Sequence, residues 1–336
     1  MRSGLKPVKI PILLGMLFIL LVTFSLVAEF FDAATAPFLM IEDIKADDDI
    51  AVDHPDDINT DIPQDDSISA GISPGIPFSD GFITVRMDPL DVFRGNLILI
   101  NNDHIYEIPE TQDFVNINEY KTASYQVTDD DHFICSTVIE PLNEMMDNFF
   151  DETGVDSIVV ISTFRDHERQ QAVLDDYIAR FGRRGAALWA AQPGYSEHHT
   201  GLAVDFGVYS NRSLRTFQGT GTTAWFAQNS YRFGFILRFP EDKVEITGTN
   251  YEPWHFRYIG LPHSYFMFMN NLCLEEYIEL ITEHTAADPF KAVRDGVPYE
   301  IYFVPSIDIP IPLDSDFDIS GNNIGGFIVT ITRAAS

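Results

Sequence analysis

The strongest constraint on folding is the difference between the first 81 residues and the rest of the chain. Residues 10–28 form a run of 19 uncharged positions, preceded by Arg2, Lys6 and Lys9. As a helix rising ~1.5 Å per residue, this run would be about 28 Å long, close to the hydrocarbon thickness of a bilayer. Because the basic residues precede the span, we expect residues 1–36 to be a cytoplasmic stub and a transmembrane signal-anchor. The rest of the chain would then lie outside the cell.

A cleaved signal peptide is the alternative for this segment. The apolar region of such a peptide is usually shorter, ~7–15 residues, and its cleavage site requires small side chains. The best candidate site is Leu26-Val27-Ala28, where leucine is large for the outer position.

The next segment is strongly acidic. Residues 41–66 carry 11 acidic side chains against a single lysine, without helical or strand periodicity, and Gly, Ser and Pro continue to about residue 81. Like charges repel and little surface can be buried, so we expect residues 37–81 to be a disordered acidic tether. Calcium binding is the alternative, but the spacing matches no EF-hand loop. The net charge of −30 for the whole chain argues against a nucleic-acid partner.

From Phe82 onward, short strands and helices mix without a regular strand–helix–strand rhythm. Apolar residues three to four apart predict a helix that ends near Gly154. A second helix is expected over 166–182, with Asp166 as its N-cap. Short apolar runs, FITVR, LILI, SIVVIS and LAVDF, are typical of strands.

These elements predict an α+β fold with a small central antiparallel sheet flanked by helices. We expect this domain over residues 82–284. Alternating strands around Asp- and Asn-rich turns then predict a small β-rich appendage over 285–336.

Two short stretches carry the chemistry. SEHHTGLAVDF offers His198 and Asp205, and YEPWHFRY offers Glu252 and His255. Catalytic zinc takes three nitrogen or oxygen ligands and leaves a position for water, and a spare glutamate can act as base. Taken alone, such a histidine is usually structural and such an aspartate usually caps a turn. The combination favours a metal site.

The same stretches resemble the VanY-type D-alanyl-D-alanine carboxypeptidases, relatives of lysostaphin-like peptidases and hedgehog domains. The resemblance covers roughly residues 90–270 and includes STFRDHERQ. It implies one Zn²⁺ held by His198, Asp205 and His255, with Glu252 as catalytic base.

Substrate contacts are also implied by the resemblance. Arg165 matches the arginine that contacts the scissile carbonyl, and Ser196 and Gln170 match positions facing the substrate's terminus. Thr163-Phe164 replaces the usual Gly-Tyr, and Asp166-His167 replaces Ser-Tyr. These departures bear on substrate preference and leave the metal set intact.

The leading hypothesis is therefore a membrane-tethered zinc carboxypeptidase that hydrolyses the terminal D-Ala-D-Ala bond of peptidoglycan stem peptides outside the cell. The alternatives are an L,D-carboxypeptidase or endopeptidase on peptidoglycan, and a non-catalytic zinc-bearing module that binds the cell wall. Glu252 discriminates against the last of these, because a binding module needs no base beside the metal.

Several neighbouring residues are assigned from local pattern alone. We expect Glu197 to face solvent and Trp254 to pack in the pocket wall. His199 is left out of the ligand set, because adjacent side chains on an extended segment point to opposite faces. Pairing of Cys135 with Cys273 stays open, as does the role of the β appendage, which either binds wall polymer or caps the domain.

Overall fold

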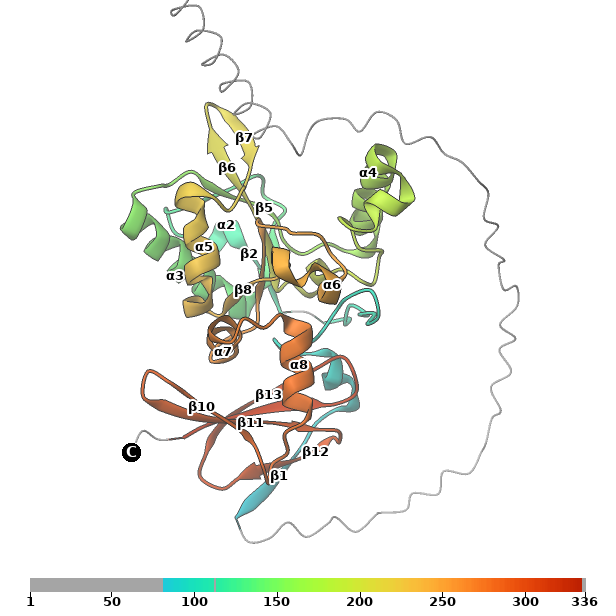
Figure 1. Cartoon of the computed structure of the whole chain (residues 1–336), viewed down its shortest axis with the longest axis vertical. Coiled ribbons are helices and arrows are strands. Elements are labelled where there is room, and N and C mark those ends of the chain that lie inside the picture. The colour runs from blue at the N-terminus through green and yellow to red at the C-terminus, as the bar shows by residue number, and fades with distance from the viewer. Residues whose placement is uncertain (1–80, 112, 334–336) are drawn as a thin grey trace, which may run out of the picture. The chain divides into compact units, whose positions relative to one another are not determined.

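A mixed sheet forms the framework of the region that holds the predicted site (Figure 1). A computed structural model describes residues 81–111 and 113–333, which belong to one compact unit. The strand order is β3-β5-β6-β9-β8, and β7 pairs with the far end of β6. The bounds are β3 (Gln126–Val127), β5 (Ile158–Ser162), β6 (Ala203–Ser210), β7 (Ser213–Thr216), β8 (Phe235–Leu237) and β9 (His255–Tyr258).

One edge of this sheet differs from the expected antiparallel arrangement. All neighbouring strands run antiparallel except β3 and β5, which are parallel. Parallel strands need a long crossover rather than a hairpin. Here the connection passes through strand β4 (Phe133–Cys135), which pairs with β2 (Phe114–Asn116), and then through a long helix.

Helices flank the sheet where the apolar spacing predicts them. The long helix α3 ends at Gly154, whose left-handed φ of 70° suits glycine. Helix α4 begins at Asp166, whose Oδ1 accepts a hydrogen bond from the Arg169 N–H at 2.7 Å. The helices are α2 (Ile117–Tyr120), α3 (Ser136–Thr153), α4 (His167–Ala186), α5 (Ala224–Asn229), α6 (Val244–Thr247), α7 (His263–Met269) and α8 (Leu274–Thr282).

The main core lies between α3, α5 and the sheet. The apolar face of α3, with Met145 and Met146 fully buried, belongs to the same cluster as the strand residues Val160 and Val204. Four buried phenylalanines fill the middle of the core with tilted and edge-to-face rings, namely Phe206, Phe217, Phe226 and Phe256.

The C-terminal residues form a second, antiparallel sheet in the order β10-β11-β14-β13. Strand β12 pairs instead with β1, so the appendage takes one strand from the beginning of the folded region. The bounds are β1 (Phe82–Arg86), β10 (Phe290–Arg294), β11 (Val297–Val304), β12 (Asp308–Pro312), β13 (Asp316–Gly321) and β14 (Phe327–Thr332).

Helices α7 and α8 join the two sheets through a shared apolar cluster (Figure 1). Ile278 of α8 packs in one cluster with Ile236 of β8 and with Ile301 and Ile328 of the second sheet. The appendage is therefore packed onto the site domain.

Residues 97–100, predicted as a strand, are buried but belong to no ladder. Their backbone groups bond elsewhere: the Leu97 N–H donates to Ser320 Oγ, and the Ile98 carbonyl accepts from Arg257 Nη2. The two cysteines are free, which closes the question of their pairing in this structure. Cys135 Sγ instead donates to the Thr200 carbonyl.

The expected membrane span and acidic tether lie outside the described residues. Within residues 81–111 and 113–333, no helix is both long and apolar enough to cross a bilayer.

A pH-dependent stability is expected from His263, at the start of α7. Its Nδ1 lies 2.7 Å from the Tyr277 hydroxyl and its Nε2 lies 3.1 Å from Thr330 Oγ1. Burial lowers the pKa of His263 to about 3. As pH falls below the ordinary value near 6.5, the unfolded chain takes up a proton that the folded chain refuses, so stability is lost.

From this group alone, the free energy of unfolding should fall by about 2 kcal/mol between pH 7 and pH 5. Urea titrations at both pH values should therefore show a smaller fall for His263→Gln than for wild type. The control His284→Gln should fall as wild type does. Equal falls in wild type and His263→Gln would contradict the assignment.

Candidate metal centre and active site

The register of β6 and β9 brings two predicted ligands together. Asp205 of β6 lies directly opposite His255 of β9, and also opposite Ser162 of β5. Residues directly opposite in an antiparallel pair point to the same face, with Cβ atoms ~5 Å apart. Pairing between β-strands thus joins residues 50 positions apart in the sequence.

A short 3₁₀ turn, Glu197–Thr200, supplies His198. Ser196 caps the turn, its Oγ accepting from the His198 N–H at 3.4 Å. Gly201 ends the turn in the left-handed region with φ 69°, and a Cβ there would lie 2.5 Å from the Phe114 ring. Only glycine therefore allows the chain to turn from His198 directly into β6.

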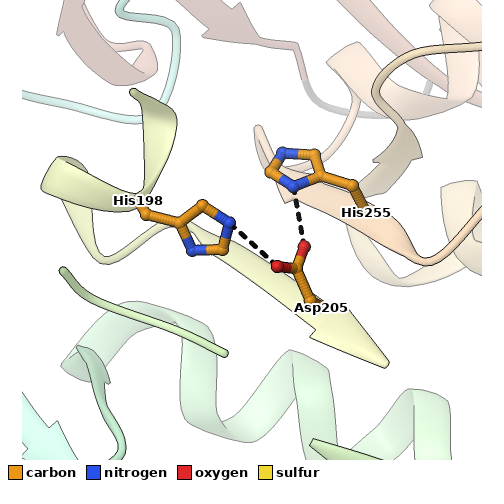
Figure 2. A group of neighbouring side chains, drawn as sticks. All are labelled: His198, Asp205 and His255. Atoms are coloured by element: carbon orange, nitrogen blue, oxygen red, sulfur yellow. Dashed lines mark hydrogen bonds and ion pairs between the residues drawn. The ribbon is translucent and has the colours of Figure 1, made fainter. Parts of the chain in front are cut away.

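The three side chains converge on one point, as Figure 2 shows. Their candidate ligand atoms all lie within 4.8 Å of one another. His198 Nε2 is 3.2 Å from Asp205 Oδ2, and His255 Nδ1 is 2.8 Å from Asp205 Oδ1. All three residues are buried.

The electrostatics of the cluster suit a cation. Burial and the charge of Arg165 lower the pKa of His198 to about 4, so the ring is neutral at pH 7. Its Nδ1–H donates to the Thr163 carbonyl at 2.6 Å, which leaves the Nε2 lone pair facing the Asp205 carboxylate. Two acceptors facing each other need a shared cation or proton. Two imidazoles and one carboxylate match the ligand set of catalytic zinc.

The carboxylate of the cluster is held ionised. Burial alone would raise the pKa of Asp205, but its close contacts with the His198 and His255 imidazoles lower it well below its ordinary range. Asp205 is therefore a charged acceptor at neutral pH.

Glu252 and Arg165 lie in the same pocket as the cluster. Glu252 precedes β9 and is 7% exposed, and burial raises its pKa to about 8. Arg165 Nη2 is 3.8 Å from Asp205 Oδ2, and the Arg165 N–H donates to the His198 carbonyl at 3.0 Å. The buried carboxyl group of Glu252 and the guanidinium group of Arg165 thus border the cluster.

Gln170 and Ser196 also line this pocket, whose volume is about 310 Å³. Gln170 Nε2 donates to the Ala191 carbonyl at 2.7 Å. Two buried polar atoms, Gln170 Oε1 and Arg165 Nε, have no hydrogen-bond partner among the described residues. Such atoms are rare because leaving them unpaired costs ~1–3 kcal/mol, so they indicate positions where a ligand completes the bonding.

His199 lies on the 3₁₀ turn and not on the extended segment that the sequence suggested. Its Nδ1–H donates to the Arg165 carbonyl at 2.6 Å, and its Nε2 accepts from the Gly194 N–H at 2.9 Å. Both ring nitrogens are used, so His199 joins two loops and does not belong to the metal cluster.

The expectation that Glu197 faces solvent is wrong. Glu197 is 4% exposed, and its Oε1 accepts hydrogen bonds from Arg238 and Arg257. The sequence did hold a signal for this, because FILRF and HFRY each place an arginine in an otherwise apolar strand segment. A buried arginine requires a buried acceptor.

Known proteins resemble this chain in sequence over the region that holds the site. Residues 131–261 match the VanY family, described as D-alanyl-D-alanine carboxypeptidase. A D-alanyl-D-alanine carboxypeptidase of Enterococcus faecium is 34% identical over 246 residues, 71% of this chain and 76% of that protein.

Two solved structures are also similar. The vancomycin resistance D,D-dipeptidase VanXYg, in complex with a D-Ala-D-Ala phosphinate analogue, is 31% identical with a TM-score of 0.66, over 75% of this chain and 99% of that one. A vancomycin resistance D,D-pentapeptidase VanY in complex with Zn(II) is 32% identical with a TM-score of 0.45, over 55% of this chain and 98% of that one.

The mixed α/β fold and the site define a zinc metallopeptidase. The chain belongs to the VanY family of D-alanyl-D-alanine carboxypeptidases.

Zinc loading tests the cluster directly. Purified full-length protein should carry one zinc per chain by elemental analysis, and His255→Ala should carry less than about a tenth of an equivalent, because three protein ligands are needed. His199→Gln removes a neighbouring imidazole outside the cluster and should keep its zinc. Equal loading of the two variants would show that the metal lies elsewhere.

Proposed function

We propose that this chain removes the terminal D-alanine from peptidoglycan stem peptides that end in D-Ala-D-Ala, with His198, Asp205 and His255 holding its zinc. The observation that carries this proposal is the convergence of the three ligands and Glu252 in one pocket. Bound zinc would polarise the scissile carbonyl and lower the pKa of water at the site.

Glu252 is the proposed general base. Burial raises its pKa, but the charge of Arg165 opposes this and a bound cation would do so further, so that the ionised carboxylate would accept a proton from the attacking water and then deliver that proton to the leaving amine. Its side chain lines the pocket together with Arg165 and the three proposed ligands. The carboxylate is therefore available to the water.

Arg165 is the proposed donor to the scissile carbonyl oxygen, where negative charge develops. Its unpaired Nε–H and its guanidinium charge both lie in the pocket. A preorganised donor of this kind typically contributes ~2.7–4 kcal/mol to transition-state stabilisation.

Gln170 and Ser196 are the proposed contacts for the terminal part of the peptide. The unpaired Gln170 Oε1 can accept an N–H from the substrate. Trp254 forms part of the pocket wall, stacked on Trp189 with ring centroids 6.2 Å apart. These flat apolar groups provide a surface for the body of the peptide.

Replacing the base separates chemistry from metal binding. Glu252→Gln keeps size but cannot accept a proton, so zinc content should stay while kcat falls by at least ~10²-fold. The control Glu245→Gln changes an exposed glutamate on α6 and should keep wild-type kcat. The measurement is release of free D-alanine from a pentapeptide ending in D-Ala-D-Ala.

Substrate length distinguishes the alternatives. D-alanine release from the pentapeptide supports D,D-carboxypeptidase activity. Cleavage of tetrapeptides only would replace the proposal by an L,D-carboxypeptidase. Wild-type activity in Glu252→Gln would contradict the role of the base.

We further propose that the protein is a single-pass membrane protein with its catalytic domain on the cell-wall side. The support is the 19-residue apolar run preceded by three basic residues and followed by acidic ones. The acidic segment would then hold the domain away from the membrane as an extended spacer.

Protease treatment of intact cells tests this topology. The protein should fractionate with membranes, and added protease should cut the acidic segment and release the folded domain. A mature N-terminus near Glu29 in the culture medium would instead show a cleaved signal peptide.

A further inference from the structure

The mechanism above leaves one buried carboxylate unused. Glu197 begins the 3₁₀ turn that carries His198, so it directly precedes a proposed metal ligand. It is 4% exposed and lines the same pocket as the cluster.

The two oxygens of this carboxylate have different partners. Oε1 accepts from Arg238 Nε at 2.7 Å and from Arg257 Nη1 at 2.8 Å. Oε2 lies 3.4 Å from His255 Nε2. One oxygen is therefore fixed by two arginines, and the other faces the imidazole of a proposed ligand.

Two guanidinium groups surround the Glu197 carboxylate. Both donate to its Oε1, so the carboxylate supplies the negative charge that these buried cations require. Both guanidinium groups are fully buried. Arg257 also donates to the carbonyls of Asn96 and Ile98, which fixes it independently of Glu197.

An ionised carboxylate can only accept, so the imidazole of His255 must donate from Nε2. With Nε2 held by Glu197, Nδ1, which lies 2.8 Å from Asp205 Oδ1, is the nitrogen that would give up its proton and bind a metal. Figure 2 shows that nitrogen facing Asp205 and the other nitrogen pointing away from the cluster. A carboxylate behind a ligating histidine fixes its tautomer and ring orientation.

We propose that Glu197 is a positioning residue for the metal: it orients His255 from behind and carries His198 on its own turn, and so sets the spacing of the two imidazole ligands. The proposal rests on the zinc site proposed above. One carboxylate then links both histidines, one through the backbone and one through a hydrogen bond.

A purely structural role, in which Glu197 only neutralises buried arginines, makes a different prediction. Glu275 of α8 provides the matched case. Its two oxygens accept from Arg238 at 2.7 and 2.9 Å, yet it lies outside the metal cluster. Removing either carboxylate leaves a buried guanidinium short of a partner. Of these two glutamates, only Glu197 contacts His255.

The experiment compares Glu197→Gln with Glu275→Gln in the full-length protein. Zinc affinity is measured by competition with a chelator, thermal stability on the zinc-free protein, and ligand geometry from the visible absorption of the Co²⁺-substituted protein. Glu197→Gln should weaken zinc binding by ~10–100-fold, as expected for a lost partner of a ligating histidine, and should alter the Co²⁺ spectrum.

Both variants should lower the Tm of the zinc-free protein, but Glu275→Gln should keep the wild-type Co²⁺ spectrum and bind zinc within ~3-fold of wild type, since it leaves the ligand's partner in place. Wild-type zinc affinity and spectrum in Glu197→Gln would overturn the proposal and leave Glu197 with a structural role.

A measurement on wild type covers the case in which Glu197→Gln does not fold. Long-range ¹H–¹⁵N NMR of the zinc-loaded protein should show His255 protonated at Nε2 and metal-bound at Nδ1. The opposite tautomer would overturn the proposal. Absence of zinc from wild type would instead refute the metal site itself, so the two failures are distinguishable.

Discussion

The active site depends on the register of three antiparallel strands. Asp205 of β6 lies opposite Ser162 at the end of β5 and opposite His255 at the start of β9. This pairing places the Asp205 carboxylate between the loop that follows β5 and the first residue of β9. A shift of one residue in either pair would turn Asp205 to the other face of the sheet. The phenylalanine-rich core beneath β6 and β9 buries one face and so keeps this register.

Around this register, buried charges are arranged in pairs. Arg238 and Arg257 share the Glu197 carboxylate, and Arg238 also binds Glu275 on α8. A buried charge without a partner is strongly unfavourable, which is why these groups occur together. Through α8, this network reaches the apolar cluster that joins the site domain to the β appendage. The appendage is therefore part of the support of the site, whatever else it binds.

The sequence predicted the parts of the site that lie within short motifs. His198 and Asp205 are seven residues apart, and Glu252 and His255 are three apart, so their spacing is visible without the fold. The helix end at Gly154 and the N-cap at Asp166 were also predictable, because both depend on local backbone chemistry.

Features that depend on distant partners were predicted wrongly. Glu197 is buried by arginines 41 and 60 positions away, and a charged residue in a polar turn gives no local sign of this. Residues 97–100 have the composition of a strand, but the Leu97 N–H bonds to a side chain 223 positions away. The parallel edge of the sheet follows from a crossover through α3, which apolar periodicity does not encode.

The central claim is that His198, Asp205 and His255 bind the zinc. Anomalous diffraction at the zinc edge, from crystals of the zinc-loaded protein, tests it most directly. The account predicts one strong peak at ~2.0–2.2 Å from His198 Nε2, an Asp205 carboxylate oxygen and His255 Nδ1. A peak that excludes any of these three side chains, or a zinc held at another cluster, would contradict it.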